Sequence, residues 1–217
     1  MADKFDYKKE YKDLYLPKRK PVLIDVPAMS FIMVDGTGDP NKSEEYQEAM
    51  EILYGLSFTI KMSGQQPAGY FEYVVPPLEG LWWFKDVDFD GIKLMDKSKL
   101  QWTSMIRQPE FVTEDIFAWA VTELKKKKPK LDLTKARLES LTEGLCVQMM
   151  HIGLYDSEPI TFAQMEQFIL DKGYINAISE PLPSGQIRRH HEIYLGDPRR
   201  TAPEKLKTVL RYPVKRI

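Results

Sequence analysis

The sequence contains a single cysteine, Cys146, in 217 residues, so it cannot form an internal disulfide. No apolar run approaches the roughly 20 residues that a membrane-spanning helix needs, and no basic, apolar leader opens the sequence. These absences predict a cytoplasmic protein that does not contact a membrane. Cys146 lies in the apolar run 145–150, which predicts a small core residue rather than a reactive thiol.

The sequence also lacks an excess of charge of either sign, because its 31 basic residues nearly balance its 32 acidic ones. Without a basic field, we expect no direct binding to nucleic acid. The lysine run 125–128 is interpreted as a solvated helix end. Metal-site spacings, GxxxxGK[ST] and GxGxxG are absent as well, so we expect neither metal nor cofactor. The glycines at 36 and 38 then indicate a tight turn.

The composition that is present, with 43% apolar residues, predicts one compact unit spanning 1–217. An arm of about twenty residues should precede the regular structure. Alternation and apolar spacing predict the elements that follow. The strands are 22–36 (bent at Pro27), 70–75, 81–84, 100–107, 145–154, 187–195 and 207–212. Three helices should begin after caps at Ser43, Thr113 and Thr161. Thr161 forms a capping-box pattern with Gln164, and Gly173 ends that helix. A shorter helix is expected at 134–141.

The order strand, helix, strand, strand occurs twice in this prediction, in residues 22–107 and 145–212. A helical insert at about 113–141 separates the two copies. The sequence therefore predicts an α+β fold of two pseudo-symmetric halves.

A strand over 187–195 would place His190, Glu192 and Tyr194 on one face and His191 on the other. Glu192 would attract a cationic ligand or act as a general base. The alternative is a solvated hairpin face. The paired histidines invite a metal hypothesis, but alternation directs them to opposite sides.

The segment 151–159, HIGLYDSEP, places His151, Gly153 and Tyr155 at alternating positions. If the strand continues through them, all three share a face, and Gly153 lets a flat ligand approach. Tyr155 could then donate a hydrogen bond to a ligand oxygen. The alternative is a core tyrosine with one satisfied hydroxyl.

The first half is rich in aromatic residues, which make good walls for planar or cationic ligands. Trp82 and Trp83 are adjacent on an expected strand, so only one of them can line a given cavity. At least half of the rings should be ordinary core. The candidate wall residues are Trp82, Trp83, Trp102, Tyr70, Phe71 and Trp119.

The order and spacing of these features resemble the GyrI-like small-molecule-binding domain. The features are the duplicated layout, His151-x-Gly153-x-Tyr155 before a helix, Gly173-Tyr174 at the end of that helix, and Glu192-x-Tyr194. This effector-binding fold also occurs in multidrug-sensing transcription regulators. The resemblance spans roughly 20–215. The segments PLEGLWW (77–83), RQPEF (107–111), HHEIYLGDPRR (190–200) and PEKLKTVLR (203–211) are similar to a stand-alone subfamily without a DNA-binding domain.

Some members of that subfamily hydrolyse the strained cyclopropane of DNA-alkylating natural products inside an aromatic cage. The resemblance implies that the two repeats form antiparallel sheets around a cleft, into which Glu192 points. We then expect Glu192, Tyr155 and Tyr194 to be catalytic, with the wall residues, His151 and His190 binding flat hydrophobic xenobiotics. The alternatives are a non-catalytic module that sequesters drugs and, less favoured, an inhibitor of DNA gyrase. A homodimer is compatible with the sequence.

Overall fold

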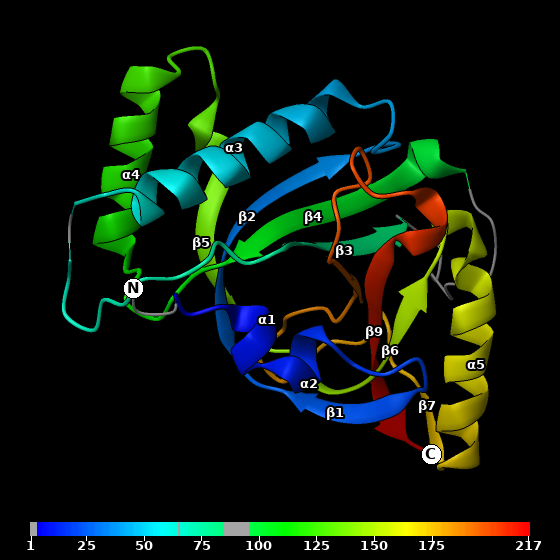
Figure 1. The fold of residues 1–217 in the computed structure, drawn as a ribbon. Helices are drawn as coiled ribbons and strands as arrows, with labels where there is room; N and C mark the ends of the chain where they lie inside the picture. The colour runs from blue at the N-terminus through cyan, green and yellow to red at the C-terminus, as the bar shows by residue number, and fades with distance from the viewer. Residues whose placement is uncertain (1–3, 65, 85–95) are drawn as a thin grey trace.

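The computed structural model describes residues 4–64, 66–84 and 96–217, and it contains both copies of the predicted repeat (Figure 1). Each copy is a strand, a long helix and two further strands, as the sequence predicts. The first copy comprises β2 (Met29–Thr37), α3 (Glu44–Lys61), β3 (Leu78–Phe84) and β4 (Leu100–Arg107). The second comprises β6 (Gly144–Ile152), α5 (Glu158–Asp171), β8 (His190–Tyr194) and β9 (Lys207–Arg216).

All strand pairs within the described ranges are antiparallel and belong to one nine-stranded arrangement, in the order β1-β6-β9-β8-β3-β4-β2-β5. The remaining strand, β7 (Tyr174–Asn176), pairs with β9. The order β2-β4-β3 in the first half mirrors β6-β9-β8 in the second. The two halves therefore meet where β3 pairs with β8, and the mixed α+β class is confirmed.

The two halves are joined again at the ends of the sheet by β1 (Val22–Val26) and β5 (Ala136–Leu141). β1 runs into β2 with a bend at Pro27, and β5 runs into β6. The register continues across this bend, since Val26 pairs with Gly144 and Met29 pairs with Leu141. The predicted strand 22–36 is thus two strands that pair with neighbours in different halves.

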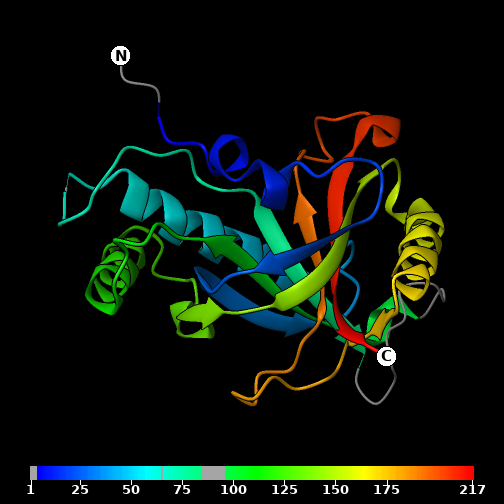
Figure 2. The same ribbon diagram turned by 90° about the horizontal axis from the view of Figure 1, so that it is seen from below.

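Helices α3 and α5 are set apart, with the central strands between them in both views, and α4 (Glu114–Lys127) packs alongside α3 (Figures 1 and 2). The amino-terminal arm forms the short helices α1 (Tyr7–Glu10) and α2 (Lys12–Tyr15). Tyr15 of the arm donates a hydrogen bond to Glu79, 3.1 Å away. Alternation along β3 puts Glu79 on the opposite face from Trp82, so the arm covers the sheet face that points away from Trp82.

Two helix starts and one helix end agree with the sequence prediction. Ser43 and Thr113 accept hydrogen bonds from the backbone N–H three residues on, which caps α3 and α4. Gly173 follows α5 with φ +77°, a conformation that glycine adopts without a Cβ clash. None of the helices in the described ranges combines the length and apolar composition needed to cross a membrane.

Two predicted elements and one predicted helix cap are wrong. The helix expected at 134–141 is a 3₁₀ turn followed by β5, because Arg137 and its neighbours pair with β2 and this tertiary pairing overrides helical spacing. Residues 70–75 contain an isolated bridge from Tyr73 to Phe5 rather than a strand. Thr161 does not cap α5, which starts at Glu158 with Pro159 in its first turn.

Candidate ligand-binding site

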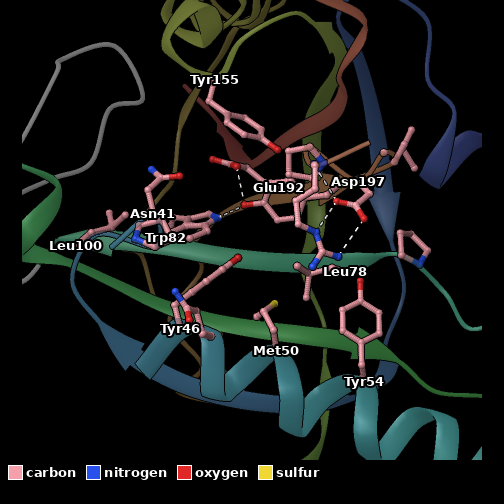
Figure 3. A pocket seen from close by; sticks show the side chains of 18 of the residues that line it. Asn41, Tyr46, Met50, Tyr54, Leu78, Trp82, Leu100, Tyr155, Glu192 and Asp197 are labelled. Carbon is pink, nitrogen blue, oxygen red and sulfur yellow. Dashed lines mark hydrogen bonds and ion pairs between the residues drawn. The ribbon is translucent and has the colours of Figure 1, made fainter. Parts of the chain in front are cut away.

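A cavity of about 1220 Å³ lies over the central strands, between α3 and α5. Tyr46, Met50 and Tyr54 extend from α3 toward Trp82 and Leu78 of β3, and Tyr155 and Glu192 lie on the other side of the space (Figure 3). Helical spacing explains why three residues of α3 reach the cavity together. The further apolar lining includes Phe58, Phe84, Leu100, Phe162 and Leu195.

Glu192 is held by hydrogen bonds at both carboxylate oxygens. The Tyr194 hydroxyl donates to Oε2 at 2.8 Å, and His190 Nε2 lies 3.0 Å from Oε1. Trp82 Nε1 donates in turn to the Tyr194 oxygen at 2.9 Å. Burial and the adjacent Glu192 raise the pKa of Tyr194 well above its usual range, so its proton stays on the hydroxyl. The expected common face of His190, Glu192 and Tyr194 is thus present.

His190 is fully buried on this face and packs edge-on against the ring of Phe162. Its Nδ1 lies 3.1 Å from the carbonyl oxygen of Arg211, which can only accept, so Nδ1 donates there, and the hydrogen bond to the Glu192 carboxylate requires a hydrogen on Nε2 as well. The other ring nitrogen faces Glu192. His190 therefore fixes the position of the Glu192 carboxylate, although it is not among the residues that line the cavity.

A second carboxyl group, Glu158, lines the same cavity from the first turn of α5. It is 91% buried, and its Oε1 has no hydrogen-bond partner among the described residues. Burial, followed by the charge of Glu192, raises the pKa of Glu158 well above its usual range. The surroundings of Glu158 in the cleft thus favour the neutral form of its carboxyl group.

Tyr155 lies in the cleft but not on the predicted strand. Strand β6 ends at Ile152, Gly153 has φ +137°, and Tyr155 belongs to the 3₁₀ turn Tyr155–Ser157. The expected shared face of His151, Gly153 and Tyr155 is therefore wrong, because the chain turns at the glycine. Burial, followed by Glu192, raises the pKa of Tyr155 to about 12. Its hydroxyl makes no hydrogen bond within the described part of the chain.

His151 does not line the cavity, but it supports the turn that carries Tyr155. Its Nδ1 lies 2.8 Å from Thr161 Oγ1, and its Nε2 lies 3.1 Å from the carbonyl oxygen of Leu154. Burial lowers the pKa of His151, which favours the neutral ring. These contacts tie the end of β6 to α5, so the predicted contact of His151 with a ligand has no counterpart in the geometry.

Of the aromatic residues proposed as walls, Trp82 lines the cavity and Trp83 does not. Trp83 faces the other side of β3, where it donates to Gln101 and stacks with Arg189. Trp102 is fully buried beneath Tyr46, 5.0 Å between ring centres. It therefore supports a wall residue.

The other candidate walls also lie away from the cavity. Tyr70 and Phe71 pack around Phe111, and Phe71 also packs against Phe5 of the arm. Trp119, on α4, packs partly buried against the core. Sequence reasoning missed Tyr46 and Glu158. Glu158 is part of the 151–159 segment, but there it resembles an ordinary first-turn acid.

His191 belongs to a buried ionic network on the opposite face of β8. Its Nδ1 lies 3.0 Å from Glu143 Oε2, its Nε2 lies 2.9 Å from Glu79 Oε2, and Arg211 Nη1 lies 3.0 Å from Glu143. The two carboxylates raise the pKa of His191 to about 9, against the effect of burial. His191 and Arg211 lower the pKa of Glu143 to about 2, although burial alone would raise it. No set of three or more His, Cys, Asp or Glu side chains in the described ranges is arranged to hold a metal ion.

Several solved structures resemble this chain along its length. A protein of Listeria innocua described as an uncharacterized conserved protein has 49% identity and a TM-score of 0.87, covering 98% of this chain and 100% of its own. A protein described as a hydrolase from Listeria innocua has 47% identity and a TM-score of 0.84, with the same coverage. No curated protein matches.

The fold extends to more distant proteins. The EcmrR C-terminal domain is 11% identical, with a TM-score of 0.53 over 91% of this chain and 98% of that domain, which shows a shared fold alone. A family model, the GyrI-like small molecule binding domain, matches residues 19–215. The match covers both repeats and every residue placed in the cleft above. The chain belongs to the family of proteins with a GyrI-like small-molecule-binding domain.

Proposed function

We propose that the cleft binds flat, hydrophobic small molecules and hydrolyses the activated cyclopropane of DNA-alkylating natural products, which would protect a cell from them. The observation that carries the proposal is the position of Glu192, held on two sides in a large aromatic cavity. Pockets for drug-sized ligands are commonly about 300–1,000 Å³. A cavity of about 1220 Å³ has room for an extended polycyclic compound.

The reaction needs little covalent help from the protein. Water attacks a cyclopropane carbon, a carbon–carbon bond of the ring breaks, and its electron pair moves into the conjugated dienone, which becomes an aromatic phenolate. Glu192 takes the proton of the attacking water, and the Tyr155 hydroxyl donates a hydrogen bond to the oxygen that becomes negative. Trp82 and Tyr46 hold the flat ring system so that the water and the carbon meet.

The engagement of both Glu192 oxygens also favours a second function, non-catalytic sequestration. A carboxylate held by Tyr194 and His190 is an acceptor with a fixed orientation, which suits the binding of a ligand that has a hydrogen-bond donor or a strongly polarised group. In that case the ligand leaves the protein unchanged. Both functions use the same cavity, so binding alone does not separate them.

The test is to incubate pure protein with a cyclopropane-bearing alkylator and follow the products by mass spectrometry, with Glu192→Gln alongside. Hydrolysis predicts a gain of one water over many turnovers, and a loss of at least about 100-fold in kcat for the variant with little change in affinity. Intact compound bound at one equivalent would support sequestration instead. Failure of the compound to bind would contradict both functions for this ligand class.

A further inference from the structure

The inference concerns Glu158, whose side chain the sequence reasoning did not single out. Glu158 is one of the residues that line the cavity and is 91% buried, and its Oε1 is unpartnered among the described residues. A buried polar atom without a partner has lost its hydrogen bonds to water and gained none in return, which is unfavourable. Such an atom in a ligand cavity indicates that a ligand provides the missing partner.

The groups around Glu158 determine which partner fits. From the central strands it faces Glu192 and Tyr194, and from its own side of the cleft Tyr155 and Asp156. Lys97 acts on Glu158 in the opposite sense, but its ammonium group lies 3.2 Å from Asp156 and is paired with it. In the described part of the chain no basic side chain forms an ion pair with Glu158. An acceptor such as a carbonyl or phenolate oxygen is therefore the complementary partner.

We propose that Glu158 is a carboxylic acid that donates its proton to an oxygen of the bound ligand and, in the hydrolysis proposed above, protonates the phenolate oxygen that forms on the ligand as the ring opens. The catalytic part of this inference rests on the proposed function. It assigns the two carboxyl groups opposite tasks in one cleft. Glu192 is fixed by Tyr194 and His190 and accepts a proton, whereas the unpartnered Glu158 gives one.

The protons balance over a turnover. Before the reaction Glu158 carries a proton and Glu192 does not. Water gives its proton to Glu192 as the new carbon–oxygen bond forms, and the phenolate takes the proton of Glu158 as the carbon–carbon bond breaks. The pair still holds one proton, which returns from Glu192 to Glu158 through solvent in the open cleft. No oxidant, reductant or metal is required.

The first experiment compares the wild type with Glu158→Gln, Glu158→Asp and the control Asp171→Asn, an exposed carboxylate at the far end of α5. We expect kcat to fall about 100-fold or more in Glu158→Gln while KM changes little, with partial rescue in Glu158→Asp. The wild-type kcat should decline as pH rises through the pKa of Glu158. Glu158→Gln should lack this alkaline limb, and Asp171→Asn should match the wild type.

The second experiment is independent of turnover and uses infrared difference spectroscopy at neutral pH. We expect a protonated-carboxyl C=O band in the wild type that shifts when the alkylator binds and is absent from folded Glu158→Gln. If the wild type turns over and Glu158→Gln equals it, the inference is overturned and the hydrolase proposal stands. If nothing turns over but the band is present and shifts, the proposed function fails and Glu158 remains the ligand's proton donor. Absence of the band overturns the inference in either case.

Discussion

Trp82 and Trp83 are consecutive in the chain and make their ring N–H hydrogen bonds on opposite faces of β3. Trp82 donates to Tyr194 in the cleft at 2.9 Å, and Trp83 donates to Gln101 at 2.7 Å. The alternation of a strand thus resolves which tryptophan touches the cavity. It also provides a matched pair of variants.

Trp82→Phe should weaken ligand binding, whereas Trp83→Phe should leave it within about threefold. Trp82 offers the larger ring to a flat ligand, and its N–H holds Tyr194 beside Glu192. We expect a loss of about 1–2 kcal/mol in binding, roughly a 10-fold increase in Kd. Titration calorimetry with the intact alkylator measures it, using Glu192→Gln as background to suppress turnover. Equal losses in both variants would contradict the placement of Trp82 as the wall.

Gly80→Ala should act on the cleft through Trp82. A Cβ at this position would lie 2.8 Å from Trp82 Nε1, so the indole must move away from the Tyr194 hydroxyl. We expect weaker binding and lower turnover. Gly64→Ala is the control, because nothing lies within 4 Å of its added Cβ. A crystal structure or tryptophan fluorescence of Gly80→Ala checks the displacement, and an unmoved Trp82 would refute it.

Tyr194→Phe should cost stability as well as activity. The change leaves the Trp82 N–H without its acceptor and removes the donor to Glu192. The unpaired N–H should cost about 1–3 kcal/mol in the free energy of unfolding. Urea denaturation measures this cost, with Tyr174→Phe on the edge strand β7 as control. If Tyr194→Phe unfolds like the wild type, the hydrogen-bond chain contributes nothing to stability.

The network of His191 and Glu143 should give stability a maximum at mildly acidic pH. Glu143 is stabilised in its ionised form, so its contribution is complete above about 4.5 and is lost as pH falls toward about 2. His191 is stabilised in its protonated form, so its contribution is complete below about 6.5 and is lost as pH rises through about 9. A shift of this size corresponds to about 3 kcal/mol.

Thermal denaturation from about pH 2 to about pH 10 covers both limbs. His191→Gln should flatten the alkaline limb and lower stability at pH 6, because Glu79 and Glu143 then lose a buried positive partner. Glu143→Gln should flatten the acidic limb. An alkaline limb that persists in His191→Gln would assign it to another group.

Much of the fold follows from local sequence rules. The strand 100–107 and the caps Ser43 and Thr113 agree with the structure, because alternation and capping are local properties. The strand predicted at 187–195 is shorter, at His190–Tyr194. The strand at 136–141 was not predicted because its conformation depends on pairing with β2, about a hundred residues away in sequence.

The same local rules predict only part of the candidate site. Period two correctly grouped His190, Glu192 and Tyr194, but it misplaced Tyr155, because the turn at Gly153 ends the strand before it. Glu158 looked ordinary because a carboxylate in the first turn of a helix needs no further explanation. Its burial depends on how the start of α5 packs around the cleft, which no local pattern encodes.

The pairing of β3 with β8 places Gly80 beside Glu192 and Trp82 beside His190, so each half of the chain contributes one wall of the cleft. The acidic wall comes from one half and most of the aromatic wall from the other. Mutations on α3 can therefore reshape the surface that contacts a ligand without removing the hydrogen bonds that hold Glu192. Such a division would let ligand preference change while Glu192 keeps its partners, and it makes α3 the natural place to begin a directed search for new ligands.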